Sequence, residues 1–243
     1  MKLLIIRHGD PDYERDSLTE KGRKEAEYLA ERLSGLDIKA FYTSSMGRAR
    51  DTAAPTLSRM GRQAEVFDWL REFDTPILRP DLEGRSIVCW DWLPQDWTEV
   101  EDFYHPDRWY LPEVMREGGV KEKYDRVIEG LDRLLAAHGY VRDGRCYRVE
   151  RPGSDTIALF CHFGVGCILL SHLLNISPMP LLHGFCAAPT SVTTVVTEER
   201  RRGTASFRVS AYGDISHLYI HAEPAAFSGR FCECFDNTDE RHD

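Results

Sequence analysis

The most constraining feature of this sequence is an alternation between short apolar segments and longer segments with helical periodicity. Residues 2–7 form an apolar run bounded by Gly9 and Pro11, which is typical of a short buried strand. Thr19 can cap a helix that extends to about residue 34, because apolar side chains recur at helical spacing after it. The alternation continues through predicted strands at 38–43, 64–70 and 156–161 and predicted helices at 46–60, 122–137 and 164–174. Such alternation predicts an α/β fold with a mainly parallel central sheet and helices on both faces.

Two pairs of segments are expected to be antiparallel. Residues 191–197 and 205–212 resemble strands, and a polar turn joins them. Asp143-Gly144 lies between two short apolar segments, an arrangement typical of a hairpin turn. The length of 243 residues fits one large α/β domain, so we expect a single domain over residues 1–243.

The periodic pattern is interrupted from about residue 73 to residue 121. This stretch is rich in proline and aromatic residues and includes Trp90, Trp92 and Trp97. We expect it to be an insertion that packs over one end of the sheet. The last segment, about residues 228–243, is polar, and we expect it to be loosely held.

Composition and charge exclude several classes of function. The formal net charge is −9, so nucleic acid is not an expected partner, because phosphate backbones need a basic surface. No apolar stretch approaches the roughly 20 residues of a membrane helix, and the short apolar run at the start is unlike a signal peptide. The seven cysteines lack regular spacing, which favours reduced thiols in the cytoplasm. Cys232 and Cys234 have no second pair nearby, so no zinc site is expected there.

Three polar motifs directly follow predicted strands of the parallel sheet. They occupy residues 7–10 (RHGD), 44–49 (SSMGRA) and 161–164 (CHFG). Such sheets bind ligands beyond the carboxyl ends of their strands, and helix N-termini favour phosphate. Taken singly, a histidine after a strand is more often a turn residue, and an arginine in a first helical turn is usually solvated. Together, two histidines and two arginines at these points predict a compact cationic pocket for an anion.

In these motifs the chain resembles the histidine phosphatase superfamily, the phosphoglycerate mutase-like proteins. The matching segments are residues 7–9 (RHG), 18–22 (LTEKG), 44–53 (SSMGRARDTA), 161–164 (CHFG) and 214–218 (DISHL). The resemblance covers about residues 1–72 and 154–219, and in combination these motifs are highly specific. The insertion matches no motif of the family, and we expect it to cover the active-site end of the sheet.

The resemblance implies roles for four residues of this pocket. His8 would be the nucleophile that becomes phosphorylated, and His162 would be the second pocket histidine, donating to the phosphoryl oxygens. Arg7 and Arg48 would bind the same oxygens. These residue types suit the chemistry, because a neutral imidazole is a nucleophile near neutral pH and guanidinium groups match phosphate oxygens. The scheme requires no metal and no other cofactor.

Three carboxylic acids are candidates for the proton donor. The family's donor is commonly a Glu in an L-x-E segment after the third strand, and Leu70-Arg71-Glu72 matches that segment. Glu72 is therefore the first candidate, with Asp74 and Glu83 as the alternatives. A carboxylic acid at this place protonates the leaving alkoxide, and the resulting carboxylate then activates water.

Two departures from the family's mutases favour hydrolysis. Glu14 stands six positions after His8, where mutases typically carry Asn, and residues 73–76 (FDTP) replace the mutase segment after the proton donor. We therefore predict hydrolysis of a small phosphorylated substrate through a phosphohistidine. Phosphoglycerate mutase is the alternative, and a non-catalytic phospho-ligand binding module is a third hypothesis. The candidates for the mouth of the substrate site are Glu14, Trp90, Trp92 and Trp97.

Overall fold

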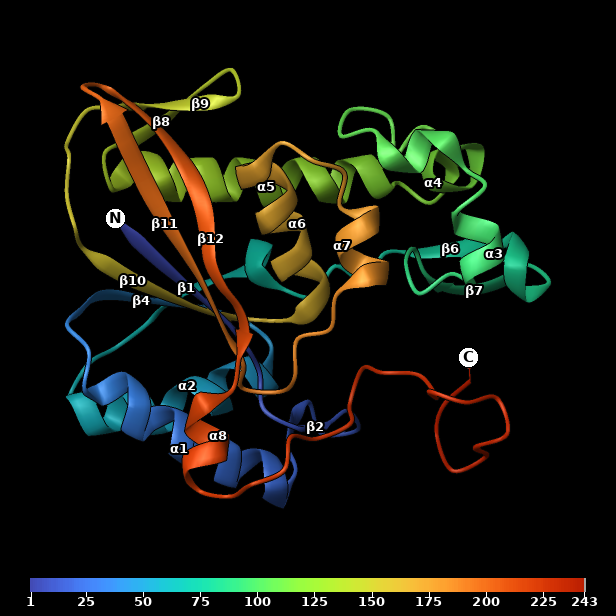
Figure 1. Ribbon diagram of the computed structural model, residues 1–243, viewed down its shortest axis with the longest axis horizontal. Helices are drawn as coiled ribbons and strands as arrows, with labels where there is room; N and C mark the ends of the chain where they lie inside the picture. The colour runs from blue at the N-terminus through green and yellow to red at the C-terminus, as the bar shows by residue number, and fades with distance from the viewer. Residues whose placement is uncertain (243) are drawn as a thin grey trace.

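The computed structural model describes residues 1–242, and an eight-stranded mixed sheet forms its centre (Figure 1). In order across the sheet, the strands are β5 (Glu65–Phe67), β4 (Ile38–Ser44), β10 (Thr156–Cys161), β1 (Lys2–Arg7), β11 (Val192–Arg201), β12 (Thr204–Asp214), β9 (Cys146–Val149) and β8 (Tyr140–Asp143). Neighbouring strands are parallel from β5 to β1 and antiparallel from β1 to β8. The predicted α/β fold is confirmed, with the parallel half around β1 and β10.

The two central strands are apolar on both faces. Every residue of β1 after Lys2 is buried, as expected of a strand that helices cover on both sides. β1 pairs in parallel with β10, and Arg7 lies opposite Cys161. This register places the residues that follow the two strands, His8 and His162, at neighbouring positions beyond the carboxyl ends of the sheet.

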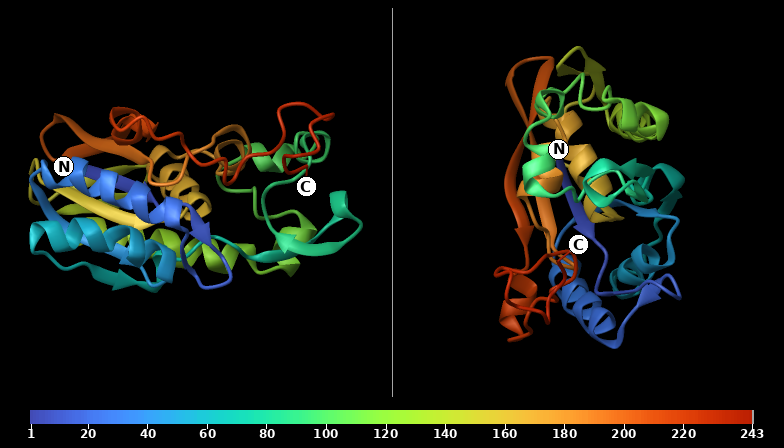
Figure 2. Two further views of the ribbon diagram at one scale, coloured as in Figure 1. Left: turned by 90° about the horizontal axis from the view of Figure 1, so that it is seen from below. Right: turned by 90° about the vertical axis from the view of Figure 1, so that its right-hand side faces the viewer.

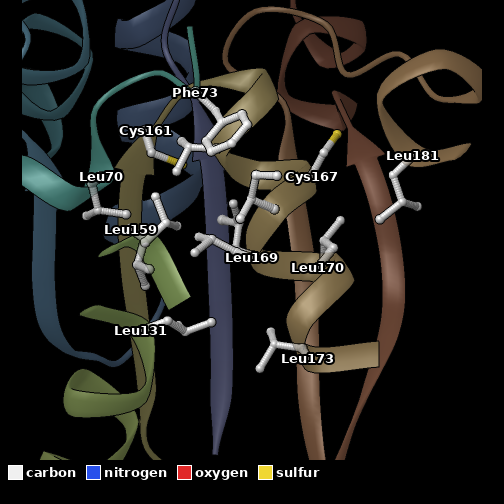
Figure 3. Close-up of a cluster of buried hydrophobic side chains, with 14 of the residues drawn as sticks. Leu70, Phe73, Leu131, Leu159, Cys161, Cys167, Leu169, Leu170, Leu173 and Leu181 are labelled. Carbon is white, nitrogen blue, oxygen red and sulfur yellow. The ribbon is translucent and has the colours of Figure 1, made fainter. Parts of the chain in front are cut away.

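Helices cover both faces of the sheet, as predicted (Figure 1). One face carries α1 (Glu20–Ser34), α2 (Gly47–Met60) and α8 (Ser216–Ile220), and the other carries α5 (Val120–Ala137), α6 (Phe163–Leu174) and α7 (Met179–Gly184). Each face of the sheet has its own cluster of buried apolar side chains. Alternate residues of β1 pack in these two clusters, because successive strand side chains point to opposite faces. Leu4 packs in the cluster with α1 and α2, whereas Ile5 packs in a larger cluster on the other face. Figure 3 shows Leu131 of α5, Leu169 of α6 and Leu159 of β10 in the larger cluster.

The predicted insertion lies beyond the carboxyl ends of β1 and β10, at one end of the molecule (Figures 1 and 2). Its regular elements are β6 (Pro76–Arg79), β7 (Arg85–Val88), α3 (Pro94–Trp97) and α4 (Glu113–Glu117), with 3₁₀ turns at 80–82 and 101–104. β6 and β7 form an antiparallel hairpin. Segments of four or five residues are too short to show a period, so the sequence alone predicted none of these elements.

One local prediction was wrong, and one small element was not predicted. The strand predicted at 64–70 ends at Phe67, and a 3₁₀ turn follows at Asp68–Leu70. The physical reason is burial: β5 is an edge strand with exposed residues, whereas Leu70 is fully buried and turns the chain toward the core. A small hairpin of β2 (Pro11–Asp12) and β3 (Ser17–Leu18) was also missed, because each strand has two residues.

The chain after α8 contains no helix or strand within residues 221–242, and it runs beside the insertion (Figure 2). Arg241 pairs with Asp91 of the insertion at 3.3 Å. The loosely held end and the single domain over residues 1–243 stay predictions, and Asp243 lies outside the described residues. No helix within residues 1–242 combines the length and the apolar character needed to cross a bilayer.

Candidate active site

Residues from three strands of the parallel half meet at its carboxyl edge. His8 follows β1, Ser44 ends β4 and His162 follows β10, and β10 lies between the other two strands. The ring centroids of His8 and His162 are 5.1 Å apart. The structure therefore brings together the motifs that the sequence placed after separate strands.

His8 is buried and held in one tautomer. Its Nδ1 lies 2.8 Å from the carbonyl oxygen of Gly9, so a proton on Nδ1 is donated there and Nε2 keeps its lone pair. Burial, with the Arg7 guanidinium next in importance, lowers the pKa of His8 to about 3. The backbone around it is fixed as well, since the Gly9 N–H donates to Thr52 Oγ1 and the Thr190 N–H donates to the His8 carbonyl. The imidazole is therefore neutral and oriented near neutral pH.

His162 contributes a second neutral imidazole. Its Nε2 lies 2.9 Å from Ser44 Oγ, and its Nδ1 is buried without a hydrogen-bond partner among residues 1–242. Burial lowers the pKa of His162 well below its ordinary value, and the neighbouring His8 and Arg48 lower it further. An unpartnered buried nitrogen carries a cost of roughly 1–3 kcal/mol, which a bound ligand oxygen would remove.

Two buried guanidinium groups face this pair of histidines. Arg7 Nη1 donates to the carbonyl oxygens of Ala187 and Ser228, and Arg48 Nη1 donates to Asp16 Oδ1 at 2.7 Å. Within residues 1–242, Nε of both arginines is buried without a hydrogen-bond partner. Both side chains therefore keep donor capacity for an anion.

A carboxylate stands at the N-terminus of α2, where phosphate is favoured. Asp16 Oδ2 accepts a hydrogen bond from the Gly47 N–H at 2.7 Å, while its other oxygen accepts from Arg48. Burial works in the opposite direction, but these donors hold the pKa of Asp16 below its ordinary value. Asp16 thus positions Arg48, and the predicted mouth residue Glu14 is exposed on the same loop.

Of the three candidate proton donors, Glu72 alone lies against the N-terminus of α6. Its Oε1 accepts hydrogen bonds from the N–H groups of Phe73 at 2.8 Å and Val165 at 2.9 Å. Burial raises the pKa of Glu72, and the N–H groups oppose that rise. Asp74 is exposed and pairs with Lys123, and Glu83 is exposed in the turn before β7. This arrangement favours Glu72 over both alternatives.

Gly164 makes the position of Glu72 possible. A Cβ at residue 164 would lie 2.8 Å from Glu72 Oε1 and 3.1 Å from the Trp90 ring. We expect Gly164→Ala to lower kcat/KM at least about tenfold, because a shift of the candidate proton donor by even 1 Å would disturb the reaction geometry. The measurement is phosphate release from an alkyl phosphate. Gly153→Ala is the control, since a Cβ there meets nothing within 4 Å; equal rates for the two variants would contradict this prediction.

A cavity of about 430 Å³ opens beside the pocket. Trp92 and Trp97 line it, together with Phe163, which directly follows the second pocket histidine. Trp90 instead packs edge-on against Phe163 at 5.8 Å and donates its indole N–H to the Phe73 carbonyl. The insertion therefore brings two of the three predicted tryptophans to a cavity at the active-site end.

Some residues of the site could not be identified from the sequence. The sequence identified Ser44 and Thr52 only as positions of a motif. It did not reveal their hydrogen bonds to His162 and Gly9. Asp16 and Thr190 gave no signal, because their contacts join segments far apart in the chain. Among residues 1–242, no group of three or more His, Cys, Asp or Glu side chains could hold a metal ion.

The family model of the histidine phosphatase superfamily (branch 1) matches residues 3–209. The chain therefore belongs to the histidine phosphatase superfamily. It is an enzyme of the phosphoglycerate mutase-like phosphatase type. The predicted membership of this superfamily is confirmed. The hypothesis of a non-catalytic binding module is not supported.

Relatives of known description agree with this family. A "probable phosphatase" of Schizosaccharomyces pombe is 27% identical over 234 residues, covering 90% of this chain and 95% of that protein. A 2,3-bisphosphoglycerate-dependent phosphoglycerate mutase of Thermoplasma acidophilum is 43% identical over 60 residues, covering 21% of this chain and 30% of that protein.

Solved structures agree in fold. A mycobacterial glucosyl-3-phosphoglycerate phosphatase has a TM-score of 0.57 at 21% identity, covering 87% of this chain and 98% of that chain. A phosphoserine phosphatase of Entamoeba histolytica, in complex with 3-phosphoglyceric acid, has a TM-score of 0.56 at 17% identity, covering 89% of this chain and 98% of that chain.

Proposed function

We propose that this enzyme hydrolyses phosphomonoesters through a phosphohistidine on His8, without a metal ion. The observation that carries the proposal is the buried pair of neutral histidines beside the guanidinium groups of Arg7 and Arg48. The hydrogen bond from His8 Nδ1 to Gly9 leaves Nε2 free to attack. Two fixed positive charges next to a neutral nucleophile suit a phosphate dianion.

In the first step, His8 Nε2 attacks phosphorus in line with the ester oxygen. The N–P bond forms, the P–O bond to the alcohol breaks, and the leaving oxygen takes the proton of Glu72. Arg7, Arg48 and His162 stabilise the equatorial oxygens, on which the charge is spread. Burial raises the pKa of Glu72. A fraction of the enzyme molecules therefore keeps Glu72 protonated at a higher pH than an ordinary glutamic acid would allow.

In the second step, the Glu72 carboxylate takes a proton from water, and the water oxygen attacks phosphorus. The N–P bond breaks, phosphate leaves and His8 returns to its neutral form. Glu72 is then protonated again, so the cycle closes without another proton source. Glu72 thus acts as an acid in the first step and as a base in the second. It can do both because it stays in one place at the N-terminus of α6.

The comparisons support hydrolysis and a small phosphorylated substrate. The relative that spans nearly this whole chain is called a probable phosphatase, whereas the similarity to the mutase covers 60 residues. The structural neighbours are called phosphatases of phosphoserine and of glucosyl-3-phosphoglycerate. Mutase activity stays the alternative, because a phosphohistidine is common to both reactions.

One assay separates the two reactions. The enzyme is incubated with a panel of phosphomonoesters in EDTA, and with 3-phosphoglycerate in the presence and absence of a bisphosphoglycerate primer. We expect phosphate release that EDTA does not abolish, and little formation of 2-phosphoglycerate. Fast primer-dependent isomerisation with negligible phosphate release would assign the enzyme to the mutases. A complete loss of activity in EDTA that metal restores would contradict the metal-independent scheme.

A further inference from the structure

The cavity beside the phosphate pocket has walls from distant parts of the chain. The insertion, the segment that follows α7 and the terminal segment (residues 228–242) all line it, and Figure 2 shows the terminal segment beside the insertion. Two lining residues lie next to residues of the phosphate pocket. Phe163 directly follows His162, and Gly229 packs on Arg7, where a Cβ would lie 3.0 Å from Nη2. The cavity therefore adjoins residues that flank the place where the phosphoryl group is proposed to bind.

Flat side chains form much of its wall. Trp97 and His183 stack with ring centroids 4.8 Å apart and an interplanar angle of 21°. On the terminal segment, Phe231 lies under the Arg241 guanidinium, 4.2 Å from its Cζ to the ring centroid. With Phe163, these residues provide ring faces and edges for an apolar group. The volume of about 430 Å³ lies within the usual range of small-molecule sites, roughly 300–1,000 Å³.

The arginines at this cavity are all engaged in ion pairs within the protein. Three arginines line it, and each pairs with a carboxylate of the protein. The pairs are Arg79 with Asp81, Arg230 with Glu233 and Arg241 with Asp91. A second anionic group on the substrate would have to compete with these carboxylates, so the cavity does not favour a charged alcohol.

His183 adds no positive charge either. Its Nδ1 lies 2.8 Å from the Met179 carbonyl, and its Nε2 accepts a hydrogen bond from the Trp92 N–H at 3.1 Å. Burial lowers the pKa of His183 to about 4, so the ring is neutral near pH 7. Both nitrogens are occupied by backbone groups, and the ring stacks on Trp97 in the wall of the cavity.

We infer that this cavity is the subsite for the alcohol part of the substrate, and that it takes an uncharged, ring-bearing alcohol. The inference rests on the proposed phosphatase activity, since a leaving group is needed to occupy the subsite. The terminal segment is then part of the substrate site and a determinant of specificity. Alcohols that carry a carboxylate, such as serine or glycerate, are excluded as preferred leaving groups.

The test compares monophosphates of primary alcohols, so that the intrinsic reactivity of the leaving groups is similar. The substrates are naphthylethyl phosphate, ethyl phosphate and phosphoserine. We expect kcat/KM for naphthylethyl phosphate to exceed that for ethyl phosphate by about 100-fold, because burial of an aromatic group is strongly favourable. We expect phosphoserine to be no better than ethyl phosphate. Equal efficiency for all three substrates would overturn the inference.

A matched pair of variants locates the preference. Phe231→Ala is expected to lower the ratio of naphthylethyl to ethyl phosphate efficiency about tenfold. Phe235→Ala is the control, because Phe235 lies on the same segment, is 84% exposed and is outside the cavity. Trp97→Ala tests the opposite wall and is expected to lower the same ratio. If the Phe231 and Phe235 variants keep the wild-type ratio, the terminal segment is not part of the subsite.

Binding without turnover separates this inference from the proposed activity. The His8→Ala protein is titrated calorimetrically with naphthylethanol, with and without the Phe231→Ala change. Binding that depends on Phe231 supports the subsite even if the wild-type enzyme hydrolyses no monoester. The lack of hydrolysis would then refute the phosphatase proposal and leave the subsite standing. Phosphate release from all three esters together with undetectable naphthylethanol binding would refute the subsite alone.

Discussion

Replacing His8 with alanine is expected to reduce phosphate release by ~10⁴-fold or more, because the variant has no nitrogen to form the covalent intermediate. The remaining groups of the pocket bind phosphate but provide no nucleophile. The wild-type enzyme, quenched during turnover, should carry a phosphate that is labile in acid and stable in base. Steady-state phosphate release and quench-labelling measure the two expectations.

A second buried histidine serves as the control for this substitution. His172 of α6 contacts Asp132 at 3.0 Å, outside the phosphate pocket. His172→Ala is expected to retain turnover and the trapped phosphate, although it removes a buried contact. Near wild-type turnover by the His8→Ala protein, with an intact circular dichroism spectrum, would remove His8 from the mechanism.

Glu72→Gln is expected to slow hydrolysis of alkyl phosphates by roughly 10²–10⁴-fold, the usual contribution of general acid–base catalysis. The amide keeps the shape of the side chain but cannot donate the proton. The loss in the first step should be much smaller for nitrophenyl phosphate, whose leaving group needs no proton. Asp74→Asn and Glu83→Gln are the controls, and either of them showing this pattern in place of Glu72 would refute the assignment.

The same variant tests the pH dependence. Because the pKa of His8 is lowered to about 3, its imidazole stays neutral down to about pH 4. A fall of kcat/KM on acidification near pH 6 should therefore follow the second ionisation of the phosphate monoester and not that of His8. The protonated form of Glu72 is the acid, so kcat/KM falls as pH rises through its pKa, which burial raises. Glu72→Gln should remove this alkaline limb. An acid limb near pH 6.5 that stays in place when the alkyl phosphate is replaced by one with a lower second pKa would show that His8 titrates normally.

The positions of the candidate pocket residues could be predicted from the sequence because each residue is tied to local structure. The short apolar segment before Arg7 and His8 predicts a strand. It therefore also predicts that these two side chains lie at the end of that strand. The same holds for Arg48 at a helix N-terminus and for His162 after β10. Each feature needs about ten neighbouring residues to be recognised, so no knowledge of the tertiary packing was required.

The rest of the site depends on contacts between distant segments, which one sequence does not reveal. Asp16 reaches Arg48 across 32 positions, and Ser228 meets Arg7 across 221. Glu72 was preferred to Asp74 because of the family's L-x-E segment, whereas its hydrogen bond at the N-terminus of α6 could not be predicted from the sequence. The terminal segment, predicted to be loosely held, lines the cavity, and its polar composition gave no sign of that position.

The order of the strands in the sheet has a consequence for biosynthesis. β10 lies between β1 and β4, yet it is made more than 100 residues after both of them. Until it leaves the ribosome, β1 and β4 each present an open edge to the solvent, and open edges pair readily with other chains. The nascent protein therefore passes through a long interval in which its open strand edges favour aggregation. The pocket forms only when β10 is inserted, so the gain of activity marks the end of that interval.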